Sequence, residues 1–252
     1  MPTIKTLITY LLFLLFTVYA HAKTTYTISE LPAPIKQKIE PQLKEFFKED
    51  LEQVKFEALA GGMSGTPVYK ATLKDNIYVV RVYGDNELAA YETTLLTRIA
   101  GNHQFGSKVY YPLNNKPTRI LISGFANGKA PNPSEYPQYK NNLAKSLREL
   151  HSITTQALPM GANLFVRSRA SLSKVGQLGP FLEGLSIINK IENALTRSPF
   201  RFGITHQDLN TLNFLYDGKK FTYIDWADGG FGDQMGDVAN LTLEFGLDDK
   251  QA

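Results

Sequence analysis

The segment 205–237 constrains the fold and chemistry of this 252-residue chain more than any other part of it. It places His206, Asp208 and Asn213 in an H-x-D-x-x-x-x-N pattern, and a short apolar run after an Asp-Gly turn signal then ends at Asp225. Apolar runs on either side of such a turn predict a β-hairpin. The pattern therefore predicts a loop and a hairpin that together bring two aspartates and an asparagine to one place.

These residue types suit phosphoryl transfer, which needs a carboxylate facing a hydroxyl and oxygen ligands for Mg²⁺. Asp208 is the candidate catalytic base. Asn213 and Asp225 are the candidate metal ligands, because an amide oxygen and a carboxylate can hold the ion together with phosphate oxygens. His206 belongs to the same catalytic loop, where we expect it to orient the loop by hydrogen bonding rather than to react.

The N-terminal segment, residues 1–22, has a different character from the rest of the chain. Lys5 precedes an uncharged apolar run, and the segment ends in Ala20-His21-Ala22. A basic start, an apolar middle and a small-x-small end predict a secretory signal peptide that is cut after Ala22. We therefore expect an exported protein, periplasmic or secreted, with a host cell as one open destination, that is anchored to a membrane only if the segment is retained.

The composition is that of a globular protein, with 43% hydrophobic residues and a formal net charge of +3 from 27 basic and 24 acidic residues. No basic run stands out, so we expect no nucleic-acid partner. Cysteine is absent, which excludes disulfides, thiolate metal sites and a cysteine nucleophile. The expected partner is a small-molecule acceptor, and the oligomeric state stays open.

Periodicity and turn signals predict a strand-rich first half and a helix-rich second half. The predicted fold class is α+β, with two lobes: an N-lobe over residues 23–126 with an antiparallel sheet and a helix, and a mainly helical C-lobe over residues 127–252. The expected strands are 54–60, 66–73, 77–83, 108–112 and 119–123, besides the hairpin. The expected helices are 32–50, as one or two helices interrupted at Pro41, and 87–100, 139–153, 181–195 and 237–245.

A kinase also needs an ATP site, and the first half supplies candidates in the expected order. Gly61, Gly62 and Ser64 lie in a glycine-rich turn between two expected strands, where backbone amides can approach phosphates closely. Arg81 on the third strand is the candidate phosphate-contacting cation, and Glu92 on the following helix is the carboxylate that would hold it.

The segment 122–125 completes the expected ATP site, with Ile122 and Phe125 placed beside the adenine.

On these residues the chain resembles the choline/ethanolamine kinase group, within the aminoglycoside-phosphotransferase-like branch of the protein-kinase fold. The resemblance runs from Leu51 to the last residue and is carried by Gly61-Gly62 and the segments 80–84, 206–213, 224–226 and 232–240. It implies ATP-dependent transfer of the γ-phosphoryl group to a hydroxyl of choline, ethanolamine or a similar amino alcohol, with Mg²⁺. It also implies that Asp237 fixes the catalytic loop from the following helix.

The chain departs from that pattern at three places, the first of which is Thr66-Pro67 in the glycine-rich loop, where Pro67 lacks a backbone donor. Ala227 stands where relatives often carry a glutamate, so metal binding by the neighbouring Asp228 is an alternative. Relatives continue for several helices, whereas this sequence ends at Ala252, so we expect it to be short at its C-terminus. Glu244 and Phe245 lie where the acceptor pocket of such relatives begins, and they are the candidate substrate-binding residues in addition to Asp208.

Two alternatives to an amino-alcohol kinase remain. The first is an aminoglycoside or thiamine phosphotransferase, which would use the same Asp208, Asn213 and Asp225. The second is a catalytically inactive, exported kinase-like binding protein, which Ala227 and the short C-terminus favour.

Overall fold

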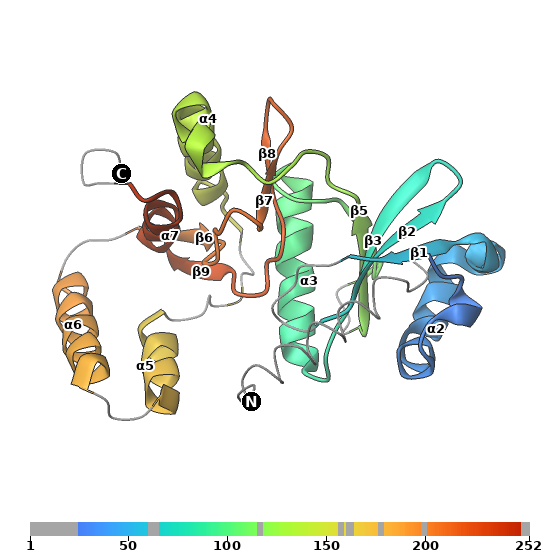
Figure 1. The fold of residues 1–252 in the computed structure, drawn as a ribbon, viewed down its shortest axis with the longest axis horizontal. Helices are drawn as coiled ribbons and strands as arrows, with labels where there is room; N and C mark the ends of the chain where they lie inside the picture. The colour runs from blue at the N-terminus through green and yellow to red at the C-terminus, as the bar shows by residue number, and fades with distance from the viewer. Residues whose placement is uncertain are drawn as a thin grey trace, which may run out of the picture. The chain divides into compact units, whose positions relative to one another are not determined.

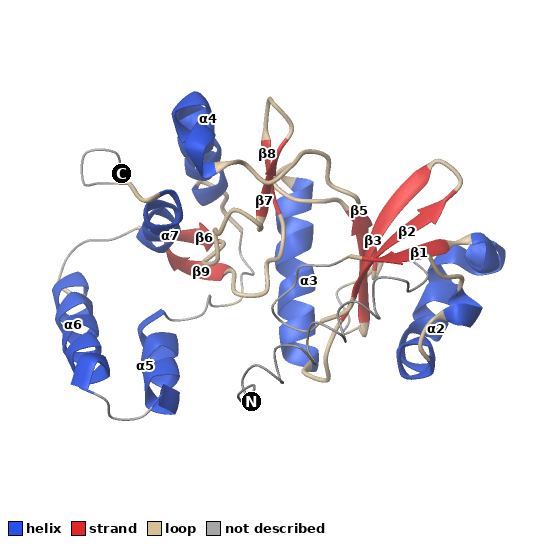
Figure 2. Cartoon of the chain, viewed as in Figure 1, coloured by secondary structure: helices blue, strands red, loops and turns tan. Residues whose placement is uncertain are grey.

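The computed structural model describes residues 25–59, 66–114, 118–155, 159, 164–175, 179–197 and 201–247. The chain packs into two compact units, residues 1–82 and 83–252, whose helices and strands are labelled in Figures 1 and 2. The expected signal peptide and the glycine-rich turn with Gly61, Gly62 and Ser64 lie outside the described residues. Within the described residues, no helix is both long and apolar enough to cross a membrane.

In its described residues, the first unit packs one α-helix and two 3₁₀ helices with three antiparallel strands. In β-sheet register, Lys55 to Ala58 pair with Thr72 to Tyr69, and Val68 to Leu73 pair with Arg81 to Asn76. The elements are η1 (Ile28–Glu30), α2 (Ala33–Phe47), η2 (Lys48–Gln53), β1 (Lys55–Ala58), β2 (Val68–Leu73) and β3 (Asn76–Val82). All three strands were predicted from the sequence.

The predicted interruption at Pro41 is wrong, because α2 continues through this residue. Ile39, Leu43 and Phe47 are spaced four residues apart and are buried, so they form one apolar face that spans the proline. A proline in a helix interior costs about 3 kcal/mol, whereas each buried apolar side chain of this size contributes about 1.5–3 kcal/mol. Burial of the face therefore outweighs the lost hydrogen bond.

The second unit contains the remaining helices and strands. They are α3 (Glu87–Asn102), β4 (Val109–Tyr111), β5 (Ile120–Gly124), η3 (Pro133–Glu135), α4 (Tyr136–His151), α5 (Leu164–Val175), α6 (Gly179–Leu195), β6 (Phe202–Thr205), β7 (Phe214–Tyr216), β8 (Phe221–Tyr223), β9 (Gly230–Asp233) and α7 (Met235–Phe245). Three antiparallel pairs form within this unit: β4 with β5, β6 with β9, and β7 with β8.

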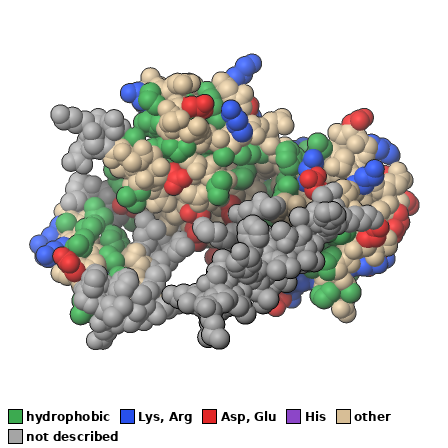
Figure 3. Space-filling model, viewed as in Figure 1, with side chains coloured by type: hydrophobic (Ala, Val, Ile, Leu, Met, Phe, Trp, Pro, Cys, Tyr) green, Lys and Arg blue, Asp and Glu red, His purple; other side chains and the backbone are tan. Residues whose placement is uncertain are grey.

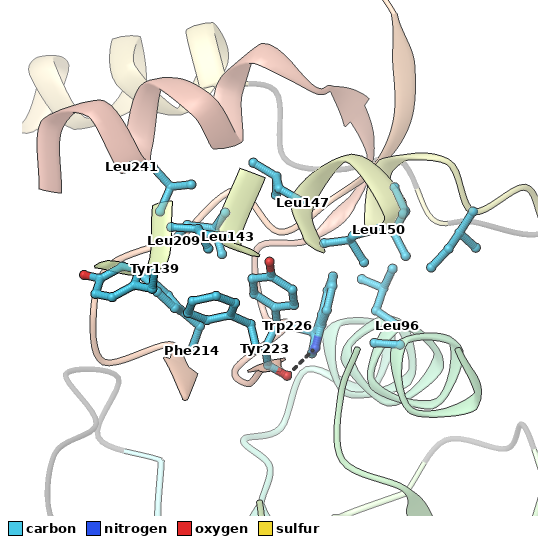
Figure 4. Packing of buried hydrophobic residues seen from close by; sticks show 14 residues of the cluster. Leu96, Tyr139, Leu143, Leu147, Leu150, Leu209, Phe214, Tyr223, Trp226 and Leu241 are labelled. Atoms are coloured by element: carbon cyan, nitrogen blue, oxygen red, sulfur yellow. Dashed lines mark hydrogen bonds between the residues drawn. The ribbon is translucent and has the colours of Figure 1, made fainter. Parts of the chain in front are cut away.

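A large hydrophobic cluster joins the helices of this unit to its short strands (Figure 4). Leu96 of α3 belongs to this cluster with Leu147 of α4 and Trp226, all at most 5% exposed. The predicted lobe boundary after residue 126 stays a prediction. However, the compact units divide after Val82, because α3 contributes core residues to the second unit.

Two features of the second unit were missed in the sequence. The first is α5, whose sequence contains three serines and a weak apolar pattern; its Arg169 pairs with Glu192 and donates to Asn189 Oδ1 of α6 at 3.0 Å. The second is the pairing of β6 with β9, in which Phe202 lies opposite Asp233. Both depend on contacts between residues that are far apart in the sequence.

Candidate active site

The predicted loop and hairpin are present in the second unit. β6 ends at Thr205, the loop 206–213 follows, and β7 and β8 form the antiparallel hairpin with Phe214 opposite Tyr223. Asp217 closes the turn by accepting the backbone N–H groups of Lys219 and Lys220, each at 2.8 Å. The hydrogen bond from Lys220, followed by that from Lys219, holds the pKa of Asp217 below its usual value.

Asp208 and Asn213 are in direct contact. The amide nitrogen of Asn213 donates to Asp208 Oδ2 at 2.6 Å and to the backbone carbonyl of Asp208 at 2.9 Å. Asn210 Nδ2 donates to the other carboxylate oxygen, Oδ1, at 3.2 Å. The loop therefore fixes the position of the half-buried Asp208 carboxylate from both sides.

Asp225 is brought to the same place by the base of the hairpin. The backbone N–H of Ile224 donates to the carbonyl of Asn213 at 2.8 Å, which extends the β7–β8 pairing by one residue. Asp225 is the next residue, and its φ of 61° lies in the left-handed region. Such a backbone costs of order 1–2 kcal/mol for a residue with a side chain and is found preferentially at functional sites. Asp208, Asn213 and Asp225 are thus gathered by one loop and one hairpin.

The loop is held from α7 by Asp237, which is 0% exposed. Its Oδ2 accepts the backbone N–H of His206 at 2.9 Å, and its Oδ1 accepts that of Gln207 at 2.7 Å. His151 Nε2, at the end of α4, lies 2.9 Å from Oδ2. Gln207 also has a left-handed backbone, with φ of 62°. One buried carboxylate therefore fixes two consecutive backbone amides of the loop, as the family resemblance implied for Asp237.

His206 contacts the base of the hairpin rather than Asp208. It is 0% exposed, its Nε2 donates to the carbonyl of Ile224 at 2.8 Å, and its ring lies 4.7 Å from that of Trp226. The other ring nitrogen, Nδ1, has no hydrogen-bond partner in the described part of the chain. These contacts support the orienting role expected for His206.

The hairpin is anchored by buried aromatic side chains. Tyr223 donates its hydroxyl to Ser146 Oγ at 3.0 Å, and its backbone carbonyl accepts Trp226 Nε1 at 3.2 Å. Burial raises the pKa of Tyr223, so its phenol stays neutral. Asp225 therefore lies between two aromatic residues, Tyr223 and Trp226, that are held by buried contacts.

The donor set fits Mg²⁺. Because both hydrogen bonds of the Asn213 amide nitrogen point to Asp208, its Oδ1 is turned away from that residue. Asn213 Oδ1 and the Asp225 carboxylate, with Asp228 as the alternative three residues on, are oxygen donors of the kind Mg²⁺ takes. Among the described residues there is no cluster of three or more His, Asp or Glu that could hold a metal alone. A site with two protein ligands accordingly relies on phosphate oxygens and water for the remaining positions.

The expected ATP-site residues are placed as follows. Arg81 is half-buried on β3 of the first unit, and Glu92 is half-buried on α3 of the second, so their pairing stays a prediction. Ile122 is 0% exposed within β5, whereas Phe125, just beyond that strand, is 41% exposed. The adenine contacts also stay a prediction; of the two side chains, Phe125 is the accessible one.

Glu244 and Phe245 are both engaged with the protein itself. Glu244 Oε1 accepts the backbone N–H and the hydroxyl of Thr211 in the catalytic loop, at 2.9 and 2.7 Å. Phe245 stacks on Tyr136 with ring centroids 4.9 Å apart and meets Phe214 edge-on at 6.3 Å. These contacts hold α7 to the loop and hairpin, a role that the sequence did not reveal; acceptor binding by the two residues stays a prediction.

Comparison with known proteins identifies the family. Residues 55–252 match the sequence model of the phosphotransferase enzyme family. The chain belongs to this family. A search of curated proteins finds no significant match.

Several solved structures share the fold of this chain. A choline/ethanolamine kinase family protein from Mesorhizobium loti superposes with a TM-score of 0.64 at 18% identity, over 85% of this chain and 73% of that one. A choline kinase from Streptococcus pneumoniae gives 0.63 at 18% identity, over 84% and 77%. An aminoglycoside phosphotransferase gives 0.59 at 16% identity, over 81% and 76%. The predicted protein-kinase-like α+β fold of this phosphotransferase is confirmed.

Proposed function

We propose that this phosphotransferase is an ATP-dependent small-molecule kinase that acts on a hydroxyl of choline, ethanolamine or a similar amino alcohol. The observation that carries the proposal is the fixed arrangement of Asp208 and Asn213, with Asp225 at the adjoining end of the hairpin. The amino-alcohol acceptor is supported by the fold similarity to proteins named as choline or ethanolamine kinases.

In the proposed reaction, Asp208 accepts the proton of the acceptor hydroxyl while the hydroxyl oxygen bonds to the γ-phosphorus and the bond to the β,γ-bridging oxygen breaks, which releases ADP. Asn213 and Asn210 hold the Asp208 carboxylate by hydrogen bonds, so that it does not have to be reoriented during the reaction. A bound Mg²⁺ would neutralise charge on the phosphates, and Asn213 Oδ1 and Asp225 are the side chains that would hold it.

Asp237 supports this chemistry without contacting the reactants. It holds the backbone of the loop that carries Asp208, with bonds of 2.7 and 2.9 Å to two consecutive amides. Preorganised geometry of this kind lowers the cost of orienting a general base.

The proposal is tested by measuring ADP release from Mg-ATP with a panel of choline, ethanolamine, thiamine and kanamycin. We expect an amino alcohol to give the highest rate, and Asp208→Asn to lower that rate by about 100- to 10,000-fold. Asp217→Asn is the matched control, because Asp217 is an exposed carboxylate in the hairpin that follows the loop and only closes the turn.

The outcomes separate the alternatives. Selective turnover of kanamycin or thiamine would replace the proposed acceptor and keep the kinase. If no acceptor raises ADP release above the Asp208→Asn level, while Mg-ATP still raises the melting temperature, the chain is a nucleotide-binding protein without turnover.

A further inference from the structure

A cavity of about 640 Å³ in the second unit is distinct from the loop and hairpin that carry the candidate catalytic residues. One wall is a single face of α4, whose lining residues recur at helical spacing from Tyr136 to His151. The other wall is a face of α7 that includes Met235, Val238 and Leu241, and Arg201 and Phe202 lie at its border. We call this feature the α4–α7 groove.

The floor of the α4–α7 groove is apolar. Leu143 and Leu147 of α4 and Leu241 of α7 line it and belong to the hydrophobic core of the unit. At its edge, Phe202 is 48% exposed and Met235 is 59% exposed. Apolar surface that is rimmed by polar residues and continuous with a core is typical of an interaction site.

The rim is positively charged. Lys140 and Arg148 on α4 and Arg201 before β6 are exposed and line the groove, and none of them forms an ion pair with a described residue. No Asp or Glu is found among the described residues that line it. By contrast, Lys145 does not line the groove and lies 3.8 Å from Glu149 on the same helix. In Figure 3, green hydrophobic surface lies over the region of α4, with blue and red side chains beside it.

We infer that the α4–α7 groove docks an amphipathic helix of a separate polypeptide, one whose apolar stripe is flanked by Asp or Glu. The two walls are helix faces, and a third helix fits such a concave surface by packing its ridges between theirs. The apolar floor would cover the stripe, and the three basic side chains would pair with the flanking carboxylates.

The groove is also next to the support of the catalytic loop. His151 lines it and contacts Asp237 at 2.9 Å, so a docked helix would lie against one of the residues that hold the loop. The docking inference itself does not depend on the proposed kinase activity, since it rests on the apolar floor and on the charges of the rim.

The test uses the full chain and two fluorescein-labelled peptides of about 18 residues, each about 27 Å long when helical. Both carry a leucine stripe; one has flanking glutamates and the other has lysines at the same positions. Fluorescence anisotropy should show at least about 10-fold tighter binding of the acidic peptide at low salt, since each exposed charge pair adds a modest amount.

Matched variants locate the binding. The double variant Lys140→Glu with Arg148→Glu should abolish the preference for the acidic peptide, and Met235→Asp should weaken both peptides. Lys145→Glu, on the same helix but outside the groove, should leave both affinities unchanged. Circular dichroism verifies that each variant is folded.

Several results would overturn the inference. Equal affinity for the two peptides would show that the basic rim does not select an acidic partner. An effect of Lys145→Glu as large as that of the Lys140→Glu, Arg148→Glu double variant would place the binding outside the groove. Concentration-dependent dimers in sedimentation that Met235→Asp abolishes would make a second copy of this chain the occupant. Binding to vesicles with anionic lipid, without binding of the acidic peptide, would make a membrane surface the occupant.

Discussion

Replacement of Asp237 by asparagine should destabilise the second unit strongly, although the side chain keeps its size. Asp237 is 0% exposed and receives three donors: the backbone N–H groups of His206 and Gln207, and His151 Nε2. An asparagine offers only one oxygen, so at least one buried donor would face an NH₂ group.

The magnitude follows from these three bonds. The least costly arrangement turns the new NH₂ group toward Gln207 and leaves that backbone N–H without an acceptor, at a cost of about 1–3 kcal/mol. The other two bonds lose the charge of their acceptor, which removes up to about 1 kcal/mol each. The expected loss is therefore about 3 kcal/mol, or a melting temperature lower by about 6–12 °C for a chain of this size.

Urea unfolding followed by tryptophan fluorescence measures this loss directly. Trp226 is the only tryptophan, is 1% exposed and lies in the same core as Leu241 of α7, so its emission reports on the second unit. The midpoint should fall by about 1 M at an unchanged slope. Leu243→Ala is the control on the same helix: its side chain is 82% exposed, so the change should be within about 0.5 kcal/mol.

A loss below about 0.5 kcal/mol for Asp237→Asn, or a loss no larger than that of Leu243→Ala, would refute the reasoning. It would mean that Asp237 does not hold the two loop amides in solution.

Three further predictions concern the second unit. Burial raises the pKa of Tyr139 to about 12, against about 10 in an unfolded chain. The contribution of the neutral phenol to the free energy of unfolding is therefore fully present below pH 10 and is lost between pH 10 and 12, because the unfolded chain releases the proton first. Tyr139→Phe should reduce the drop in urea midpoint between about pH 9 and pH 11. Gly203→Ala should cost about 1–3 kcal/mol in the same assay, because the new Cβ would lie 2.7 Å from the carbonyl oxygen of His151; an unchanged midpoint would show that the backbone there yields. If the proposed kinase is correct, Asp225→Asn should raise the Mg²⁺ concentration needed for half-maximal ADP release about 10-fold or more, and an unchanged Mg²⁺ dependence would favour Asp228 as the ligand.

Local sequence signals predicted most of the regular structure correctly. The strands 55–58, 68–73 and 76–82 alternate or carry β-branched residues and are separated by turn signals, and these features depend only on nearby residues. The hairpin was predicted for the same reason, from its Asp-Gly turn. Pro41 misled the prediction, because the burial that keeps α2 continuous is a tertiary effect.

The sequence predicted Asp208, Asn213 and Asp225 as a group. The structure joins Asp208 to Asn213 by hydrogen bonds and places Asp225 one residue after the Ile224–Asn213 pairing, and both are local features of one loop and one hairpin. The sequence did not reveal that Glu244 holds Thr211, or that α4 and α7 form a groove with a basic rim. Those contacts join residues that are far apart in the chain, and neither helix carries a signal for its partner.

The sequence by itself thus determined the family, most of the strands and helices, and the residues that form the loop, since each depends on residue types at short spacing. Only the tertiary structure decided how the loop is held. The Asp237 carboxylate contacts two loop amides and His151 because folding removes it from water. In the interior, a buried charge has to be matched by donors from the elements packed around it.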